Sequence, residues 1–134
     1  QLMMELGLIY PDHPEKPKML HNDTGKFESA FINVDVSENN SVMLKSLSGS
    51  RLSIWVAHGE GKFSFPCYRD NYQLIMSYSY DNYPGNPNGS DWDTAAVCSN
   101  NGRHLAMMPH PERSFLAWQA HWLPEKMKKS LKTK

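Results

Sequence analysis

The sequence has few cysteines, no long apolar run and no signal peptide, and each absence excludes a class of protein. Its two cysteines, Cys67 and Cys98, have no CxxC partner and are too few for a disulfide framework, so a reducing compartment fits best. No apolar stretch approaches the ~20 residues that a membrane-spanning helix needs. The first residues lack a basic region and a cleavage site. We therefore predict a soluble, cytoplasmic protein that does not bind membranes.

Net charge is also absent, because fourteen basic residues balance fourteen acidic ones. No overall field therefore attracts nucleic acid or an anionic surface, and we predict no nucleic-acid binding. The one basic cluster lies at the C-terminus and consists of Lys126, Lys128, Lys129, Lys132 and Lys134. Such a run is typical of a solvated segment. We predict one domain over residues 1–124 and a flexible basic tail over residues 125–134.

The regular structure that the sequence does favour is mostly β-strand. Apolar runs and alternating patterns predict strands at 27–36, 52–57, 74–80, 94–98 and 104–108. Asn100-Asn101-Gly102 is typical of a hairpin between the last two strands. A helical face over 2–9, closed by Gly7, and an aromatic segment over 115–122 predict helices. Strands with few helices between them favour the sheet half of an α/β domain or an α+β fold.

Two loops that follow predicted strands carry the pattern His-x-Glu, at residues 58–60 and 110–112. Loops beyond buried strands are where α/β folds place their sites. Pro111 disfavours helical angles at His110, so we predict an extended segment in which residues two apart point the same way. Glu112 would then hold one ring nitrogen of His110 as a donor and leave the other as a base.

Spacing alone leaves three uses of these residues open. A lone His-x-Glu in a loop is most often a surface ion pair. A catalytic pair would need a thiol, but Cys98 is expected to be a small buried hydrophobe, and Cys67 lies in a loop that does not turn into a helix. The third use is a divalent-metal site in a hydrolase. No His-x-x-x-His pattern and no cysteine pair in the sequence supports such a site. Its ligands would be His58, Glu60, His110 and Glu112.

Three motifs occur in order along the chain and together resemble the glutaminase domain of the phosphoribosylformylglycinamidine synthase family. They are Val-Ala-His-Gly-Glu-Gly-Lys-Phe at 56–63, Tyr-Pro-Gly-Asn-Pro-Asn-Gly-Ser at 83–90 and Met-Met-Pro-His-Pro-Glu-Arg at 107–113. The segment 22–28 is similar to the family's Asn-x-Ser-x-Arg-Phe-Glu, with Thr24 and Lys26 as conservative departures. The resemblance covers residues 1–124.

The resemblance implies a fold and a place for the missing thiol. The family has an α/β class I glutamine amidotransferase fold, flavodoxin-like, with a mostly parallel sheet and helices on both faces. This chain would be its C-terminal portion. The family's nucleophile elbow reads Gly-x-Cys-Asn-Gly-Cys-Gln and runs into a helix, which residues 1–9 resemble. Gln1 would be the elbow's final glutamine, and the nucleophilic cysteine would lie four positions before it.

The same resemblance implies roles for residues of this chain. His110 would be the triad base and Glu112 its orienting carboxylate, while Gln1 and the backbone of Gly59 and Glu60 would contact glutamine. The cysteine attacks the glutamine amide and ammonia leaves, after which water hydrolyses the thioester. Ammonia would pass to a synthetase domain, where ATP and magnesium convert formylglycinamide ribonucleotide to its amidine.

These 134 residues would supply only part of that chemistry. They contain no glycine-rich loop that cradles a phosphate, so we expect no cofactor and no metal within them. Without the thiol, we expect them to be inactive alone. The alternative to catalysis is a docking module that uses the Asn, Pro, Gly and Trp loops against a partner domain.

Overall fold

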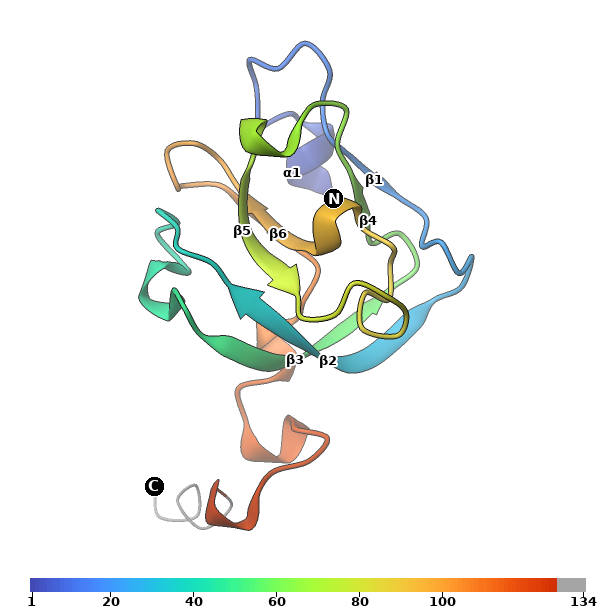
Figure 1. The fold of residues 1–134 in the computed structure, drawn as a ribbon, viewed down its shortest axis with the longest axis vertical. Helices are drawn as coiled ribbons and strands as arrows, with labels where there is room; N and C mark the ends of the chain where they lie inside the picture. Colours follow the sequence, from blue (N-terminus) through green and yellow to red (C-terminus); the bar gives the residue numbers. More distant parts are fainter. Residues whose placement is uncertain (128–134) are drawn as a thin grey trace.

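Five strands form one sheet in the order β3-β2-β5-β6-β7 in the computed structural model, which describes residues 1–127. Their bounds are β2 (Glu28–Val36), β3 (Arg51–His58), β5 (Gln73–Tyr78), β6 (Thr94–Cys98) and β7 (Leu105–Met107). A separate pair consists of β1 (Lys18–Leu20) and β4 (Lys62–Ser64). Figure 1 shows the larger sheet curling around the middle of the molecule, with α1 beside the smaller pair.

Helical structure is sparse in the described residues. One α-helix, α1 (Leu2–Glu5), is four residues long and is followed by Gly7 at a φ of 65°. Residues 125–127 are also α-helical, and five single 3-10 turns are present: η1 (Lys45–Leu47), η2 (Arg69–Asn71), η3 (Asp91–Asp93), η4 (Pro111–Arg113) and η5 (Ala117–Gln119). The helix predicted at the N-terminus is confirmed in shortened form.

The predicted flavodoxin-like fold, with a mostly parallel sheet and helices on both faces, is wrong for this structure. Every strand pair within residues 1–127 is antiparallel. Parallel neighbours need a crossover of a dozen or more residues, usually a helix, whereas antiparallel neighbours can be joined by turns. The connections here hold only 3-10 turns. The chain therefore forms a half-barrel of antiparallel strands.

The strand positions themselves are confirmed. Each of the five predicted apolar segments forms a strand of the larger sheet, and the predicted hairpin joins β6 to β7 with Gly102 at a φ of 75°. The helix predicted over 115–122 is wrong. Its apolar side chains stay largely exposed, as in Phe115 at 71% and Trp118 at 78%, so no packing stabilises a longer helix.

Strand β6 separates two apolar clusters and is buried along its whole length. Ala96 and Cys98 belong to the cluster that includes Val34 and Val56, whereas Val97 belongs to the one that includes Phe63. Cys98 is fully buried, and burial raises the pKa of its thiol, which confirms the predicted role as a small hydrophobe. Of the predicted basic tail over 125–134, residues 128–134 lie outside the described part.

Candidate functional site

The turn between β3 and β4 is held from one side by Asn22, which is 3% exposed. The side-chain amide of Asn22 donates to the carbonyls of His58 at 2.7 Å and Lys26 at 2.9 Å. Its oxygen accepts the N–H of Gly61 at 3.0 Å, and its own N–H donates to the carbonyl of Gly59 at 2.9 Å. One side chain thus fixes both ends of the turn over residues 58–61.

The loop over residues 86–90 holds the same turn from the other side. The side-chain oxygen of Asn86 accepts the N–H groups of Gly89 at 3.0 Å and Ser90 at 3.1 Å, which closes the loop on itself. The hydroxyl of Ser90 accepts the N–H of Phe63 at 3.1 Å and donates to the carbonyl of Gly61 at 3.3 Å. Two sequence motifs far apart in the chain therefore meet at this turn.

His58 is a partly buried ring in the middle of this arrangement. Its Nε2 lies 3.5 Å from Nδ2 of Asn88, while its buried Nδ1 has no hydrogen-bond partner. Burial has the largest effect and lowers the pKa of His58, against a backbone hydrogen bond that raises it; the neighbouring His110 lowers the pKa further and Glu28 raises it. The imidazole of His58 is therefore neutral at neutral pH.

His110 and Glu112 form a close pair, with Nδ1 of His110 2.6 Å from Oε1 of Glu112. The side chain of His110 is 28% exposed and that of Glu112 is 61% exposed. His110 is anchored to β3 by an isolated bridge, in which its N–H donates to the carbonyl of Trp55 at 2.8 Å. Because Nδ1 is engaged, Nε2 is the ring nitrogen left for proton transfer.

The predicted extended conformation of this segment is wrong, although its two side chains do meet. His110 has φ −106° and ψ 88°, and the following residues form the 3-10 turn η4. The N–H of Arg113 donates to the carbonyl of His110 at 3.0 Å, which folds the chain back. The turn, not a shared face of a strand, therefore brings the carboxylate to the ring.

Two residues that sequence reasoning missed hold the pair in place. The hydroxyl of Ser114 accepts the N–H of Trp55 at 3.1 Å and donates to the carbonyl of His110 at 3.3 Å. The side-chain amide of Gln119 donates to the backbone carbonyl of Glu112 at 3.1 Å, and the backbone carbonyl of Gln119 accepts the indole N–H of Trp55 at 2.6 Å. The Ser114 side chain, and the side chain and backbone carbonyl of Gln119 together, thus tie the pair to strand β3.

The carboxylate of Glu112 remains ionised at neutral pH. Partial desolvation raises its pKa, but a backbone hydrogen bond and the contact with His110 outweigh this, with a further contribution from Arg113. The net effect holds the pKa of Glu112 below its ordinary value. An ionised carboxylate beside a ring nitrogen fixes the tautomer of His110 and stabilises its protonated form.

The predicted substrate contacts gather at the turn and not at the pair. The side-chain amide of Gln1 donates to one oxygen of Glu60 at 3.3 Å, and Nε2 of His21 lies 3.5 Å from the other oxygen. Gly59 is next to Glu60 in the same turn. The effect of His110 on the pKa of His58 indicates that the turn and the pair interact electrostatically.

The four proposed metal ligands do not converge. Within residues 1–127, no group of three or more His, Cys, Asp or Glu side chains is placed to hold a metal ion. The hypothesis of a divalent-metal site at His58, Glu60, His110 and Glu112 is therefore not supported.

In the same part of the chain, no helix has the length and apolar character needed to cross a bilayer.

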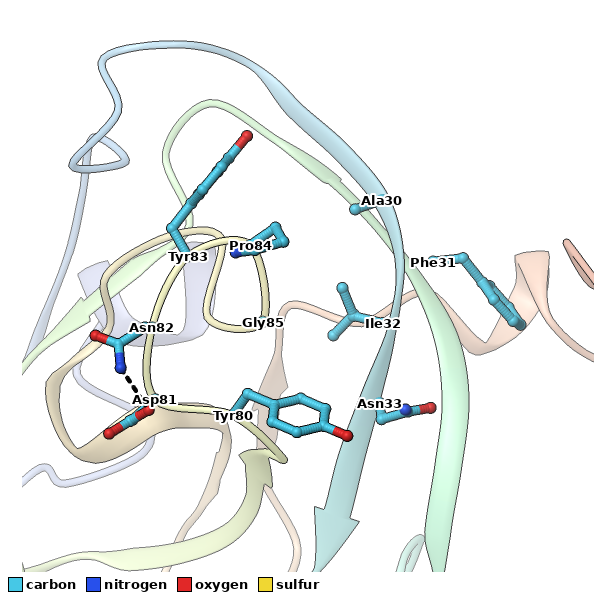
Figure 2. A pocket seen from close by; sticks show the side chains of 10 residues that line it. All are labelled: Ala30, Phe31, Ile32, Asn33, Tyr80, Asp81, Asn82, Tyr83, Pro84 and Gly85. Carbon is cyan, nitrogen blue, oxygen red and sulfur yellow. Dashed lines mark hydrogen bonds between the residues drawn. The ribbon is translucent and has the colours of Figure 1, made fainter.

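Two cavities differ in their relation to the pair. One of about 600 Å³ is lined by β2 residues such as Ala30 and Ile32 and by the loop over 80–85 (Figure 2), and none of the candidate residues lines it. The other, about 370 Å³, is lined in part by Trp55, Arg113 and Gln119, which surround the pair. The smaller cavity is therefore the one beside the proposed base.

A family model and several curated relatives assign the chain to the same protein family. The family model for the CobB/CobQ-like glutamine amidotransferase domain matches residues 1–134. A probable phosphoribosylformylglycinamidine synthase, chloroplastic/mitochondrial, from Arabidopsis thaliana is 45% identical over 121 residues, which cover 81% of this chain and 9% of the relative. Phosphoribosylformylglycinamidine synthases from Dictyostelium discoideum and Homo sapiens are 36% and 39% identical, over 98% and 85% of this chain and 11% and 10% of their own lengths.

A solved structure agrees with this match. The structure of PurLQS from Thermotoga maritima aligns with a TM-score of 0.71 and 28% identity, over 98% of this chain and 56% of that chain. The chain spans roughly a tenth of the length of its curated relatives, from 9% to 11% in these three. The resemblance to the glutaminase domain of phosphoribosylformylglycinamidine synthase is confirmed, and the chain belongs to the CobB/CobQ-like glutamine amidotransferase domain family.

Proposed function

We propose that this chain supplies the base and the orienting carboxylate of a glutaminase centre that hydrolyses glutamine to glutamate and ammonia. The observation that carries the proposal is the 2.6 Å contact between Nδ1 of His110 and Glu112, on a segment bonded to β3. A ring whose Nδ1 is held by a carboxylate presents Nε2 to a nucleophile, which is the arrangement that activates a thiol. Membership of the amidotransferase family supports the same chemistry.

The nucleophile in this proposal is a cysteine four positions before Gln1 in the intact enzyme. Nε2 of His110 accepts the thiol proton as sulfur attacks the side-chain amide of glutamine, and the proton then passes to the departing ammonia. Water, deprotonated by the same nitrogen, hydrolyses the thioester. Cys98 is unsuited to the role, because it is fully buried and burial raises its pKa.

The turn over 58–61 is the proposed binding element for glutamine. Gln1, Gly59 and Glu60 are the proposed contacts, and the hydrogen bond between the side chains of Gln1 and Glu60 supports a common location. The backbone of the turn is immobilised by Asn22 and by the loop over 86–90. A fixed backbone binds a small polar substrate without an added ordering cost.

The larger reaction that we propose is ATP-dependent synthesis of formylglycinamidine ribonucleotide in de novo purine biosynthesis. The relatives are named as phosphoribosylformylglycinamidine synthases, and about nine-tenths of each lies outside the match. We infer that ammonia passes to a synthetase domain of the same enzyme, which binds ATP, magnesium and formylglycinamide ribonucleotide. We place this enzyme in the cytoplasm, which cell fractionation tests against the organellar name of the Arabidopsis relative.

The experiment compares glutamine with free ammonia as the nitrogen source in the full-length parent enzyme. We expect His110→Ala to abolish glutamine-dependent synthesis and to leave ammonia-dependent synthesis unchanged, because ammonia supplied directly replaces the product of the glutaminase. A glutamine-derived electrophile should label one cysteine of the unmodified enzyme. An enzyme that forms no adduct and uses only free ammonia would instead be consistent with a docking module.

A further inference from the structure

Asn88 is a fully buried polar side chain at the centre of the network around the turn over 58–61. Its Nδ2 lies 2.7 Å from the hydroxyl of Tyr78 and 2.9 Å from the carbonyl of Gly61. A primary amide has two N–H donors, and these two short contacts use both. The more distant ring nitrogen of His58, at 3.5 Å, is therefore packed against the amide rather than strongly bonded to it.

The backbone of Asn88 connects the same network to the N-terminal segment. Its carbonyl accepts the N–H of Asp23 at 3.1 Å, next to the Asn22 that fixes the other side of the turn. Asn88 therefore contacts both segments that hold the turn as well as the turn itself. Its Oδ1 is buried without a hydrogen-bond partner, which is a cost that an apolar side chain of similar volume would avoid. The side chain at this position is an amide because its Nδ2 donates a hydrogen bond to the turn.

We propose that Asn88 is a positioning residue for glutamine binding, which fixes the orientation of the 58–61 turn by donating a hydrogen bond to the carbonyl of Gly61. The inference rests on the proposed function, because it takes that turn as the binding element. Among the described residues, no hydrogen bond joins Asn88 to His110 or Glu112. Loss of the donor therefore weakens substrate binding and leaves proton transfer at the pair intact.

The test uses Asn88→Asp in the full-length enzyme, with glutamine hydrolysis followed by steady-state kinetics. This substitution keeps the size of the side chain but places an acceptor opposite the carbonyl of Gly61. We expect KM for glutamine to rise about tenfold, while kcat changes by less than about threefold. Tyr78→Phe keeps the donation to Gly61 and should raise KM by less than about threefold.

Two controls separate positioning from general damage. Ammonia-dependent synthesis should be unchanged in Asn88→Asp, which reports an intact synthetase. Asn100→Asp makes the same chemical change in the exposed β6–β7 turn and should leave both activities unchanged.

The inference is overturned if KM stays constant in Asn88→Asp, if kcat alone falls, or if ammonia-dependent synthesis is lost as well. An unmodified enzyme that does not hydrolyse glutamine would contradict the proposed function itself, which is a different result from any of these.

Discussion

Gly61 is a position in the turn where the structure leaves no room for a side chain, and Gly61→Ala is therefore a sharp test of the turn. An added Cβ would lie 2.8 Å from Nδ2 of Asn88 and 2.5 Å from Cε1 of His58, both closer than packed atoms allow. Moving the amide of Asn88 away weakens its bonds to the Gly61 carbonyl and to Tyr78, at about 1 kcal/mol each. We expect the local stability of the turn to fall by about 2 kcal/mol.

Hydrogen exchange of the full-length enzyme measures this local stability. A loss of about 2 kcal/mol corresponds to roughly 30-fold faster exchange of the amides in the peptide over 56–63. Gly59→Ala is the matched control for exchange, because its Cβ would meet only Phe27, at 3.9 Å. Equal acceleration in both variants would refute the reasoning, since the crowding around Gly61 would then play no part.

Four further predictions concern the pair, the turn and the thiols. Glu112→Gln should lower kcat for glutamine hydrolysis about 10²-fold or more with little change in KM, because an amide cannot stabilise the protonated ring of His110. The pKa of Glu112 is lowered from 4.5, so its carboxylate should stay ionised above that pH and take up a proton only as the pH falls through the lower, folded value; NMR titration of the Glu112 side-chain carboxyl carbon measures this. Asn22→Ala leaves two carbonyls and one N–H without partners and should destabilise the turn by about 2–3 kcal/mol, seen as faster exchange than in the unmodified enzyme. Thiol labelling of the folded protein, mapped by mass spectrometry, should modify the half-buried Cys67 well before Cys98; equal rates would contradict the burial of β6.

Strand positions could be predicted from the sequence, but strand directions could not. The alternating and apolar patterns of β2, β3 and β6 are local, and each marks a face or a buried segment that any sheet would need. Direction depends instead on the connections. The resemblance to an α/β family implied parallel neighbours, whereas 3-10 turns join the strands described here. Local pattern therefore fixed the elements and left the topology open.

The candidate site shows the same division between local and distant information. His110 and Glu112 are two residues apart, so their pairing could be expected, although a turn and not an extended segment produces it. Ser114 and Gln119 could not be predicted, because their partner Trp55 is 59 and 64 residues away. Asn22 lies in a motif that the sequence analysis identified, but its role could not be predicted, because its partners in the turn are 36 and 39 residues further along the chain.

Strand β3 is attached to the proposed base at Trp55 and leads into the proposed binding turn at His58, so its register positions both. Trp55 bridges to His110, and the binding turn begins at His58. At a rise of about 3.3 Å per residue, these two points lie about 10 Å apart along one strand. Pairing with β2 from Glu28↔His58 to Asp35↔Arg51 sets that strand in place. A slip of one residue between β3 and β2 would reverse the faces of Trp55 and Val56, and it would shift both the bridge to His110 and the start of the binding turn out of register with β2. The antiparallel sheet is therefore the element that aligns the proposed base with the proposed binding turn.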